Sequence, residues 1–232
     1  MGDFNQFTWV ENNRHLIKGP VLEIGSKFYD STTSIDYRKI CAGAAYTGVD
    51  LSEGENVDKV IDFTSDINSI RETLNGTFNT IICCSVMEHV KDIYAFAKNL
   101  STVLNSDGVL FLSVPFTWEF HGYPNDFWRF TPAAIKFLFP TLDFSMSKIT
   151  ISSSQDRDVL TLLKDEDINR FLLKENVYLK FEEKNSGAFR LLKKLINVIR
   201  YPVYRKELII RKMLGSEYRL SLSCINMIGV KL

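Results

Sequence analysis

The sequence has little net charge, few cysteines and no long apolar run. Its 232 residues include 28 basic and 28 acidic side chains, so its formal net charge is zero. A neutral chain gives no overall electrostatic reason to bind nucleic acid. No apolar run approaches the roughly 18 residues of a membrane-spanning helix, and the first residues carry neither a secretion signal nor a myristoylation signal. We therefore expect a cytoplasmic protein that has no nucleic-acid partner.

Cysteine is scarce and is not arranged for metal binding. The four cysteines are Cys41, Cys83, Cys84 and Cys224, and no two have the Cys-x-x-Cys spacing. Cys83 and Cys84 are adjacent in an apolar strand, where successive side chains point to opposite faces. We expect buried thiols in a reducing compartment and predict no metal site.

Two short apolar runs each carry an acid near their carboxyl end. Residues 21–25, Val-Leu-Glu-Ile-Gly, predict a buried strand that turns sharply at Gly25, and residues 46–51 predict a second strand that ends at Asp50. Open α/β sheets bind ligands at the edge formed by the carboxyl ends of their strands, and a carboxylate there suits the hydroxyls of a ribose. The two runs predict a pocket for a cofactor that contains a nucleoside.

Three further runs, at residues 58–63, 78–84 and 108–115, predict the next strands. With its strands and motifs in this order, the chain resembles the class I S-adenosyl-L-methionine (SAM)-dependent methyltransferases, and among them those called methyltransferase type 11. The matching elements, within residues 18–151, are Glu23-x-Gly25, Asp50, Asp62, residues 85–90 and residues 105–108. The resemblance implies an α/β fold, with a Rossmann-like seven-stranded sheet, helices on both faces and a helical insertion between strands six and seven.

A NAD-dependent dehydrogenase is the main competing interpretation, because it also places an acid at the end of its second strand. Its phosphate loop needs three glycines, so that the backbone can approach a pyrophosphate. Residues 26–30, Ser-Lys-Phe-Tyr-Asp, contain no glycine. This favours the methyltransferase, although the loop also lacks the glycines usual in methyltransferases, so how the methionine end of SAM is held stays open.

The resemblance assigns SAM binding to a set of strand-end residues: Glu23, Gly25, Asp50, Leu51, Asp62, Phe63, Cys84 and Ser85. Asp50 would bind the ribose, with a solvated turn aspartate as the alternative. The adenine would meet Asp62 or Phe63, with Asp62 accepting from its amine and Leu51 against its ring.

Glu23 and the end of the fourth strand face the methionine end in this assignment. An acid inside a strand is costly unless it meets a cation. The ammonium of SAM is one candidate partner of Glu23, and Lys27 or a pair of backbone amides is the alternative. Cys84 and Ser85 would approach the sulfonium, although small residues at strand ends are common without any ligand.

A loop of unusual composition, residues 115–132, follows the fifth strand. It resembles a subset of bacterial methyltransferases found among surface-polysaccharide and cell-envelope assembly enzymes. The resemblance favours an acceptor pocket formed by Trp118, Tyr123, Trp128 and Arg129, because aromatic faces suit sugar rings and charged groups suit hydroxyls. The alternative is structural: Asp126 and Arg129 pair to hold the loop, while Trp128 and Phe130 fill the core.

Methyl transfer to an alcohol needs alignment and the removal of one proton. Histidine titrates near neutrality, so His121 is the predicted base and His89 the alternative. Asp126 is a second candidate base or the acid that orients the histidine. His89 follows Glu88 at a predicted helix start, where it could instead cap or orient the loop beneath the cofactor.

The predicted domains are a SAM-binding core at 1–154, a helical insertion at 155–217 and a closing strand of the core sheet at 218–232. Within the insertion, residues 184–212 contain nine basic residues and one acid, a local charge of +8 in a neutral chain. This segment could pack on the core, form a homodimer interface or lie on an anionic membrane surface. Packing is the plainest of the three explanations.

These patterns predict a SAM-dependent methyltransferase that O-methylates a sugar or glycan intermediate, including a lipid-linked one. One alternative is a catalytically silent methyltransferase-like binding subunit, suggested by the unusual loop after Gly25. Others are a methyltransferase acting on another small molecule or on nucleic acid. Nucleic acid is disfavoured, because residues 84–87 are Cys-Ser-Val-Met rather than an Asn-Pro-Pro-Tyr base pocket.

Overall fold

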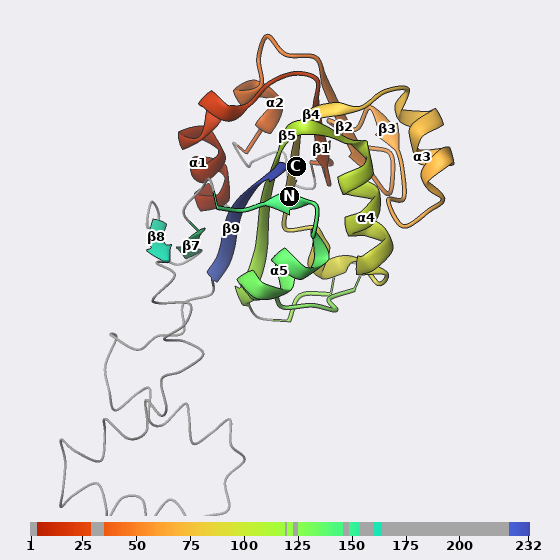
Figure 1. The fold of residues 1–232 in the computed structure, drawn as a ribbon. Coiled ribbons are helices and arrows are strands. Elements are labelled where there is room, and N and C mark those ends of the chain that lie inside the picture. The colour runs from red at the N-terminus through yellow and green to blue at the C-terminus, as the bar shows by residue number, and fades with distance from the viewer. Residues whose placement is uncertain are drawn as a thin grey trace, which may run out of the picture. The chain divides into compact units, whose positions relative to one another are not determined.

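The computed structural model describes residues 4–28, 35–118, 120–122, 125–145, 149–153, 160–163 and 223–232 (Figure 1). A nine-stranded sheet forms its centre, with the order β3-β2-β1-β4-β5-β9-β7-β8 and with β6 also paired to β9. The strands are β1 (Val21–Ile24), β2 (Tyr46–Asp50), β3 (Lys59–Val60), β4 (Phe78–Cys84), β5 (Leu104–Thr117), β6 (Leu142–Asp143), β7 (Ile149–Ser153), β8 (Leu160–Leu163) and β9 (Ser223–Lys231).

The first five strands are parallel, and β9 runs antiparallel to both β5 and β7. The chain therefore crosses over between β1 and β4, the topological switch point at which open α/β sheets bind ligands. The Rossmann-like methyltransferase sheet predicted from the sequence is confirmed. The sixth strand, which the sequence predicts near residues 147–151, is β7, and the closing strand, predicted within residues 218–232, is β9.

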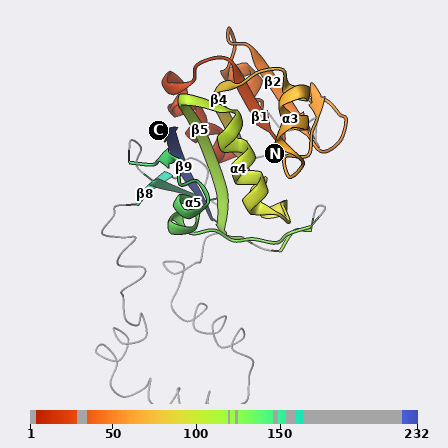
Figure 2. The same cartoon turned by 45° about the vertical axis from the view of Figure 1, so that its right-hand side comes forward.

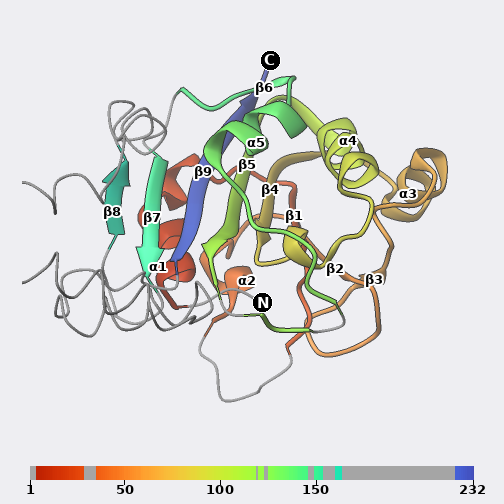
Figure 3. The same ribbon diagram turned by 90° about the horizontal axis from the view of Figure 1, so that it is seen from below.

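The helices are α1 (Phe4–Asn12), α2 (Tyr37–Ile40), α3 (Ile67–Leu74), α4 (Ile93–Val103) and α5 (Pro132–Leu138), with 3-10 turns η1 (Arg14–Leu16) and η2 (Met87–His89). Figure 3 shows α1 and α2 on one face of the sheet and α4 and α5 on the other. Figure 2 shows α4 alongside β4 and β5. Helices thus cover both faces, as predicted. None of the described helices is long and apolar enough to cross a membrane.

One buried cluster fixes the face under α1 and α2. It joins Trp9 of α1 to Phe111 of β5, whose rings meet edge-on with centroids 5.7 Å apart, and it also contains Cys41 and Cys84. All four cysteines are buried thiols that form no disulfide, as predicted. Because side chains alternate along a strand, Cys84 faces α1 while Cys83 faces the opposite layer.

The predicted insertion at 155–217 lies outside the described residues, apart from Leu160–Leu163. Those four residues form β8, which pairs antiparallel with β7, so the sequence prediction of a helical pattern starting at 155 is wrong there. A short apolar run does not distinguish strand from helix by periodicity, and its pairing partner decides the outcome.

Candidate active site

A cavity of about 870 Å³ lies where the sequence predicts the cofactor, at the carboxyl ends of the parallel strands. Nine of the predicted site residues line it: Gly25, Asp50, Leu51, Asp62, Phe63, Ser85, His89, Trp118 and His121. Five others are not part of this lining: Glu23, Cys84, Asp126, Trp128 and Arg129. Tyr123 lies outside the described residues.

The turn after β1 shapes the first wall of the cavity. Gly25 has φ +76°, a left-handed conformation that favours glycine. The amides of Gly25 and Ser26 both donate to the carbonyl of Val49, at 2.9 and 3.0 Å. The chain therefore turns from β1 directly toward the end of β2, which carries Asp50.

Asp50 is held by backbone amides at the end of β2. Its Oδ1 accepts from the amide of Leu51 at 2.8 Å and its Oδ2 accepts from the amide of Lys27 at 3.3 Å. The residue is only 8% exposed, whereas the sequence predicted an exposed strand-end carboxylate. A carboxylate has about four acceptor sites, so two amides leave capacity for ribose hydroxyls.

Asp62 and its neighbours form the side suited to a purine. Oδ1 of Asp62 accepts from the amide and the hydroxyl of Thr64, at 2.8 and 2.7 Å, which leaves Oδ2 for an amine of a ligand. Phe63 is buried edge-on against Phe96, and Leu51 is 62% exposed at the cavity. Asp50 is thus placed for the ribose hydroxyls of SAM and Asp62 for its adenine amine. The apolar side chains beside them suit the adenine ring.

Glu23 is buried beside this wall rather than in it. Burial raises its pKa from an ordinary 4.5 to about 8, and a hydrogen bond with the Asn56 side chain opposes the shift. Its Oε2 has no hydrogen-bond partner among the described residues. The predicted contact of Glu23 with the ammonium of SAM stays a prediction.

Ser85 joins the cavity to a buried polar network that the sequence did not reveal. Its hydroxyl accepts from Nε2 of Gln6 at 2.9 Å and donates to Oε1 of Gln6 at 3.1 Å. The same Nε2 also donates to the hydroxyl of Ser113 at 2.8 Å. Ser113 in turn donates to Asn226 at 2.5 Å. Gln6, Ser113 and Asn226 are fully buried. Only the polar type of these residues is visible in the sequence, because their partners lie far apart along the chain.

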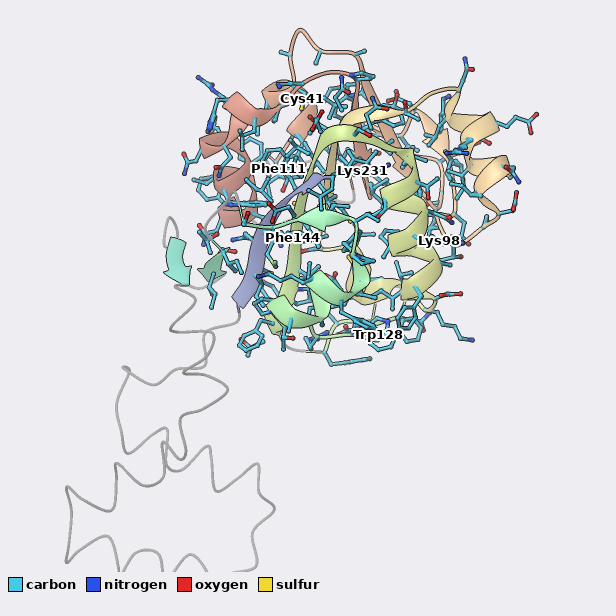
Figure 4. All side chains as sticks on the ribbon, viewed as in Figure 1. Cys41, Lys98, Phe111, Trp128, Phe144 and Lys231 are labelled. Atoms are coloured by element: carbon cyan, nitrogen blue, oxygen red, sulfur yellow. The ribbon has the colours of Figure 1, made fainter. Side chains whose placement is uncertain are left out.

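The two predicted catalytic segments lie side by side. The amide of Phe127 donates to the carbonyl of Glu88 at 2.7 Å, and Nε1 of Trp128 donates to the carbonyl of Val90 at 2.8 Å. Figure 4 shows Trp128 near the lower end of α4, and its side chain is partly exposed. Residues 125–128 are therefore fastened along η2 and the residue that follows it.

Asp126 and Arg129 hold this loop together. Nη1 and Nη2 of Arg129 donate to the two carboxylate oxygens of Asp126, at 2.5 and 2.7 Å, and the guanidinium also contacts the carbonyl of Trp118. The hydrogen bonds from Arg129 are the main reason why the pKa of Asp126 is lowered to about 2. This pairing is the structural alternative considered from the sequence, and Phe130 is buried as that alternative expected. Trp128 is 38% exposed, so the expectation that it fills the core is wrong.

His89 and His121 both reach the cavity. Their rings are nearly perpendicular, with centroids 5.0 Å apart. Nδ1 of His121 lies 3.4 Å from Oδ2 of Asp126, so Asp126 is placed to orient this histidine. Burial lowers the pKa of His89 below its ordinary value of 6.5, and the carbonyl of Asn125 opposes the shift.

Glu88 is a cavity residue to which the sequence assigned no role. Its side chain is 1% exposed, and its Oε2 has no hydrogen-bond partner within the described part of the chain. Burial raises its pKa from 4.5 to about 7. An acid beside a histidine at a predicted helix start was the only signal in the sequence.

A family model described as a methyltransferase domain matches residues 18–142, more than half of the chain. The chain belongs to this family. The methyltransferase has SAM as its cofactor, as predicted. No curated protein matches it.

Solved structures of similar fold agree with this assignment. A SAM-dependent methyltransferase from Archaeoglobus fulgidus is 13% identical, with 97% of this chain and 92% of that chain covered and a TM-score of 0.52. The YcgJ protein from Bacillus subtilis is 13% identical, with 97% of each chain covered and a TM-score of 0.53. A possible histamine N-methyltransferase from Thermotoga maritima is 12% identical, with 100% and 90% covered and a TM-score of 0.50. At these identities the likeness concerns the fold.

Proposed function

We propose that this methyltransferase methylates a hydroxyl of a sugar or glycan intermediate. One observation carries the proposal. A single cavity is lined by Asp50 at the end of β2 and Asp62 after β3. It is also lined by Trp118 and His121 of the loop after β5, which form what we call its acceptor end. A methyl donor and an alcohol acceptor that enter it meet beside a histidine.

The chain supplies binding, alignment and a route for one proton. Asp50 accepts hydrogen bonds from the ribose hydroxyls, Asp62 accepts one from the adenine amine, and Leu51 lies against the ring. Bound SAM supplies a methyl group already activated on its sulfonium. His121 removes the proton of the acceptor hydroxyl while Asp126 orients the ring, as general-base catalysis requires.

Aromatic side chains near the acceptor end favour a sugar. Trp118 lines the cavity with its ring 6.3 Å from that of His121, and Phe120, Phe127 and Trp128 are exposed nearby along the loop. Apolar faces of this kind suit the C–H faces of sugar rings. The resemblance of the loop to envelope-assembly methyltransferases supports a bacterial, cytoplasmic role in polysaccharide synthesis.

Mass spectrometry of metabolites and glycans tests the substrate class. A deletion strain should lack a methylated sugar or glycan that its parent contains, and the purified protein should restore it in extracts supplied with SAM. The same methylated species in both strains, or SAM binding without turnover on any extract, would overturn the proposal. The second result favours a silent binding subunit.

Mutation of the histidines tests the chemistry. His121→Ala should slow transfer to the identified acceptor about 10²–10⁴-fold, the usual loss when a general base is removed, with nearly unchanged SAM affinity. His89→Ala is the matched comparison, and the larger loss in that variant would exchange the two roles.

A further inference from the structure

Three potential metal ligands meet at the acceptor end of the cavity. Glu88, His89 and His121 each offer one ligand atom, and these atoms all lie within 4.8 Å of one another. Glu88 and His89 come from η2, whereas His121 comes from the loop after β5. The sequence predicted no metal because this cluster forms only when the two segments are fastened together.

The burial of Glu88 and its unsatisfied carboxylate oxygen point independently to a cation. Its side chain is 1% exposed, it lines the cavity, and its Oε2 accepts no hydrogen bond from any described residue. Oε1 lies 3.9 Å from Nε2 of His89, beyond hydrogen-bond distance. A buried carboxylate is costly unless it is paired or coordinates a metal.

The outer contacts of the two histidines suit metal ligation. Nδ1 of His89 lies 2.6 Å from the carbonyl oxygen of Asn125, which only accepts, so this nitrogen carries the hydrogen and Nε2 carries the lone pair. Nδ1 of His121 lies 3.4 Å from the carboxylate of Asp126, itself held by Arg129. Metal-bound histidines usually donate their other ring N–H to a carbonyl or a carboxylate.

We propose that Glu88, His89 and His121 bind one divalent transition-metal ion. Two imidazoles and one carboxylate suit ions such as Zn²⁺, Co²⁺, Fe²⁺ or Mn²⁺, and three protein ligands leave coordination positions open. The cavity gives a hydroxyl oxygen of the acceptor access to such a position. The ion extends the acceptor site beyond the apolar contacts and fixes which oxygen faces the methyl donor.

The catalytic use of the ion rests on the proposed function, whereas its binding does not. An oxygen bound to the ion loses its proton more easily. The O–H bond breaks and its proton passes to cavity water. The new O–C bond forms as the C–S bond breaks, and sulfur keeps the electron pair. With the ion bound, His121 is a metal ligand and no longer the general base described for the metal-free site, so removing it costs both metal binding and activity.

Cobalt binding to the full-length protein tests the site directly. Chelator-stripped protein is titrated with Co²⁺, followed by visible absorption and calorimetry, and Zn²⁺ is then added as competitor. One equivalent should bind and be displaced by Zn²⁺. Affinity should fall at least about tenfold in Glu88→Gln, His89→Ala and His121→Ala, since even losing outer contacts of metal ligands costs about 10–100-fold.

His15→Ala is the matched control, because it removes the third histidine of the chain, which is exposed on η1. Its Co²⁺ affinity should equal that of wild type. No Co²⁺ or Zn²⁺ binding by wild type, or equal affinity in the three cluster variants, would overturn the proposal. Calorimetry with SAM on each variant confirms folding.

Asp50→Asn separates this site from the methyltransferase assignment. The variant should lose SAM affinity and keep Co²⁺ binding, whereas Glu88→Gln should lose Co²⁺ affinity and keep SAM binding. If the wild-type protein binds SAM and transfers methyl groups but does not bind Co²⁺ or Zn²⁺, the metal site is wrong and the methyltransferase assignment stands.

Discussion

Asp50 has two functions, because it lines the cavity and also anchors the turn after β1. Asp50→Asn keeps its size and an acceptor for one amide but removes the charge. Hydrogen bonds to charged groups contribute about 1.5–3 kcal/mol, so SAM affinity measured by calorimetry should fall about 10- to 100-fold. The melting temperature should change little.

Asp50→Ala is the comparison that separates the two functions of this residue. It removes the acceptors for the amides of Lys27 and Leu51, so it should lower thermal stability as well as SAM affinity. Unchanged affinity in Asp50→Asn would contradict the ribose assignment.

Glu23 should make stability depend on pH. Its folded pKa of about 8 exceeds its ordinary 4.5, so the folded protein holds more protons between these values. The free energy of unfolding should therefore fall as pH rises from about 4.5 to about 8 and then level off. One pKa unit corresponds to about 1.4 kcal/mol, so Glu23→Gln should be more stable than wild type at pH 8 by on the order of a few kcal/mol.

Urea unfolding of both proteins between pH 4.5 and pH 9 measures the effect of Glu23. Glu11→Gln, which changes an exposed glutamate of α1, is the control and should follow wild type. Parallel pH profiles for wild type and Glu23→Gln would show that the buried carboxylate does not titrate as described.

Strand-end residues were the ones that the sequence could predict. Gly25 and Asp50 stand at positions fixed by strand length and turn chemistry, which are local properties. Gln6 and Glu88 could not be assigned a role, because their roles depend on contacts across the fold. Cys84 lies between these two kinds of residue, because its element follows from local properties but its surroundings do not. Its strand was predicted, yet the alternation of side chains turns it toward α1 and away from the cavity.

At the scale of elements, the ion pair of Arg129 with Asp126 helps to hold the loop after β5. Arg129→Ala leaves the carboxylate of Asp126, 1% exposed, without its main partner. The free energy of unfolding in urea should fall by about 1–3 kcal/mol, the cost of leaving a buried group unpaired. Arg129→Lys should be intermediate, because lysine keeps the charge without the two-pronged contact.

Lys136→Ala on α5 is a matched control for the loop, because Lys136 is an exposed cation. It should unfold like wild type. If Arg129→Ala also does so, the pair does not stabilise the loop.

Element boundaries were less predictable than element types. The fifth strand was predicted from residue 108 but begins at Leu104, because β4 pairs with it through Phe78 before a shift in register. β8 was missed for a similar reason. The pairing of residues 160–163 with β7 is not visible in their local pattern, and this pairing rather than propensity decides their conformation.

At the scale of the molecule, the polar network beside the cavity joins both ends of the described chain. Gln6 of α1 and Asn226 of β9 meet at Ser113, and Gln6 passes the network on to Ser85 at the cavity. One compact unit, residues 1–163 with 221–232, contains all of these residues. A long segment can therefore be inserted between β8 and β9 without separating the parts of the site.

The basic part of that inserted segment, residues 184–212, lies outside the described residues, and its charge supports a membrane prediction. Each basic residue near an anionic surface contributes about 1 kcal/mol, and salt weakens the attraction as the Debye length shortens. With nine basic residues and one acid, this segment should carry the protein to anionic liposomes at low salt and release it at high salt.

Cosedimentation measures that attraction, and two triple variants locate it. Changing Lys193, Lys194 and Arg200 to Glu should abolish pelleting. Changing the exposed Lys39, Lys98 and Lys136 to Glu alters net charge equally and should leave pelleting intact. If wild type stays in the supernatant at low salt, or both variants behave alike, the segment does not direct the enzyme to membranes. Packing against the core or a homodimer would then account better for its composition, because either would cover its apolar residues without a lipid surface.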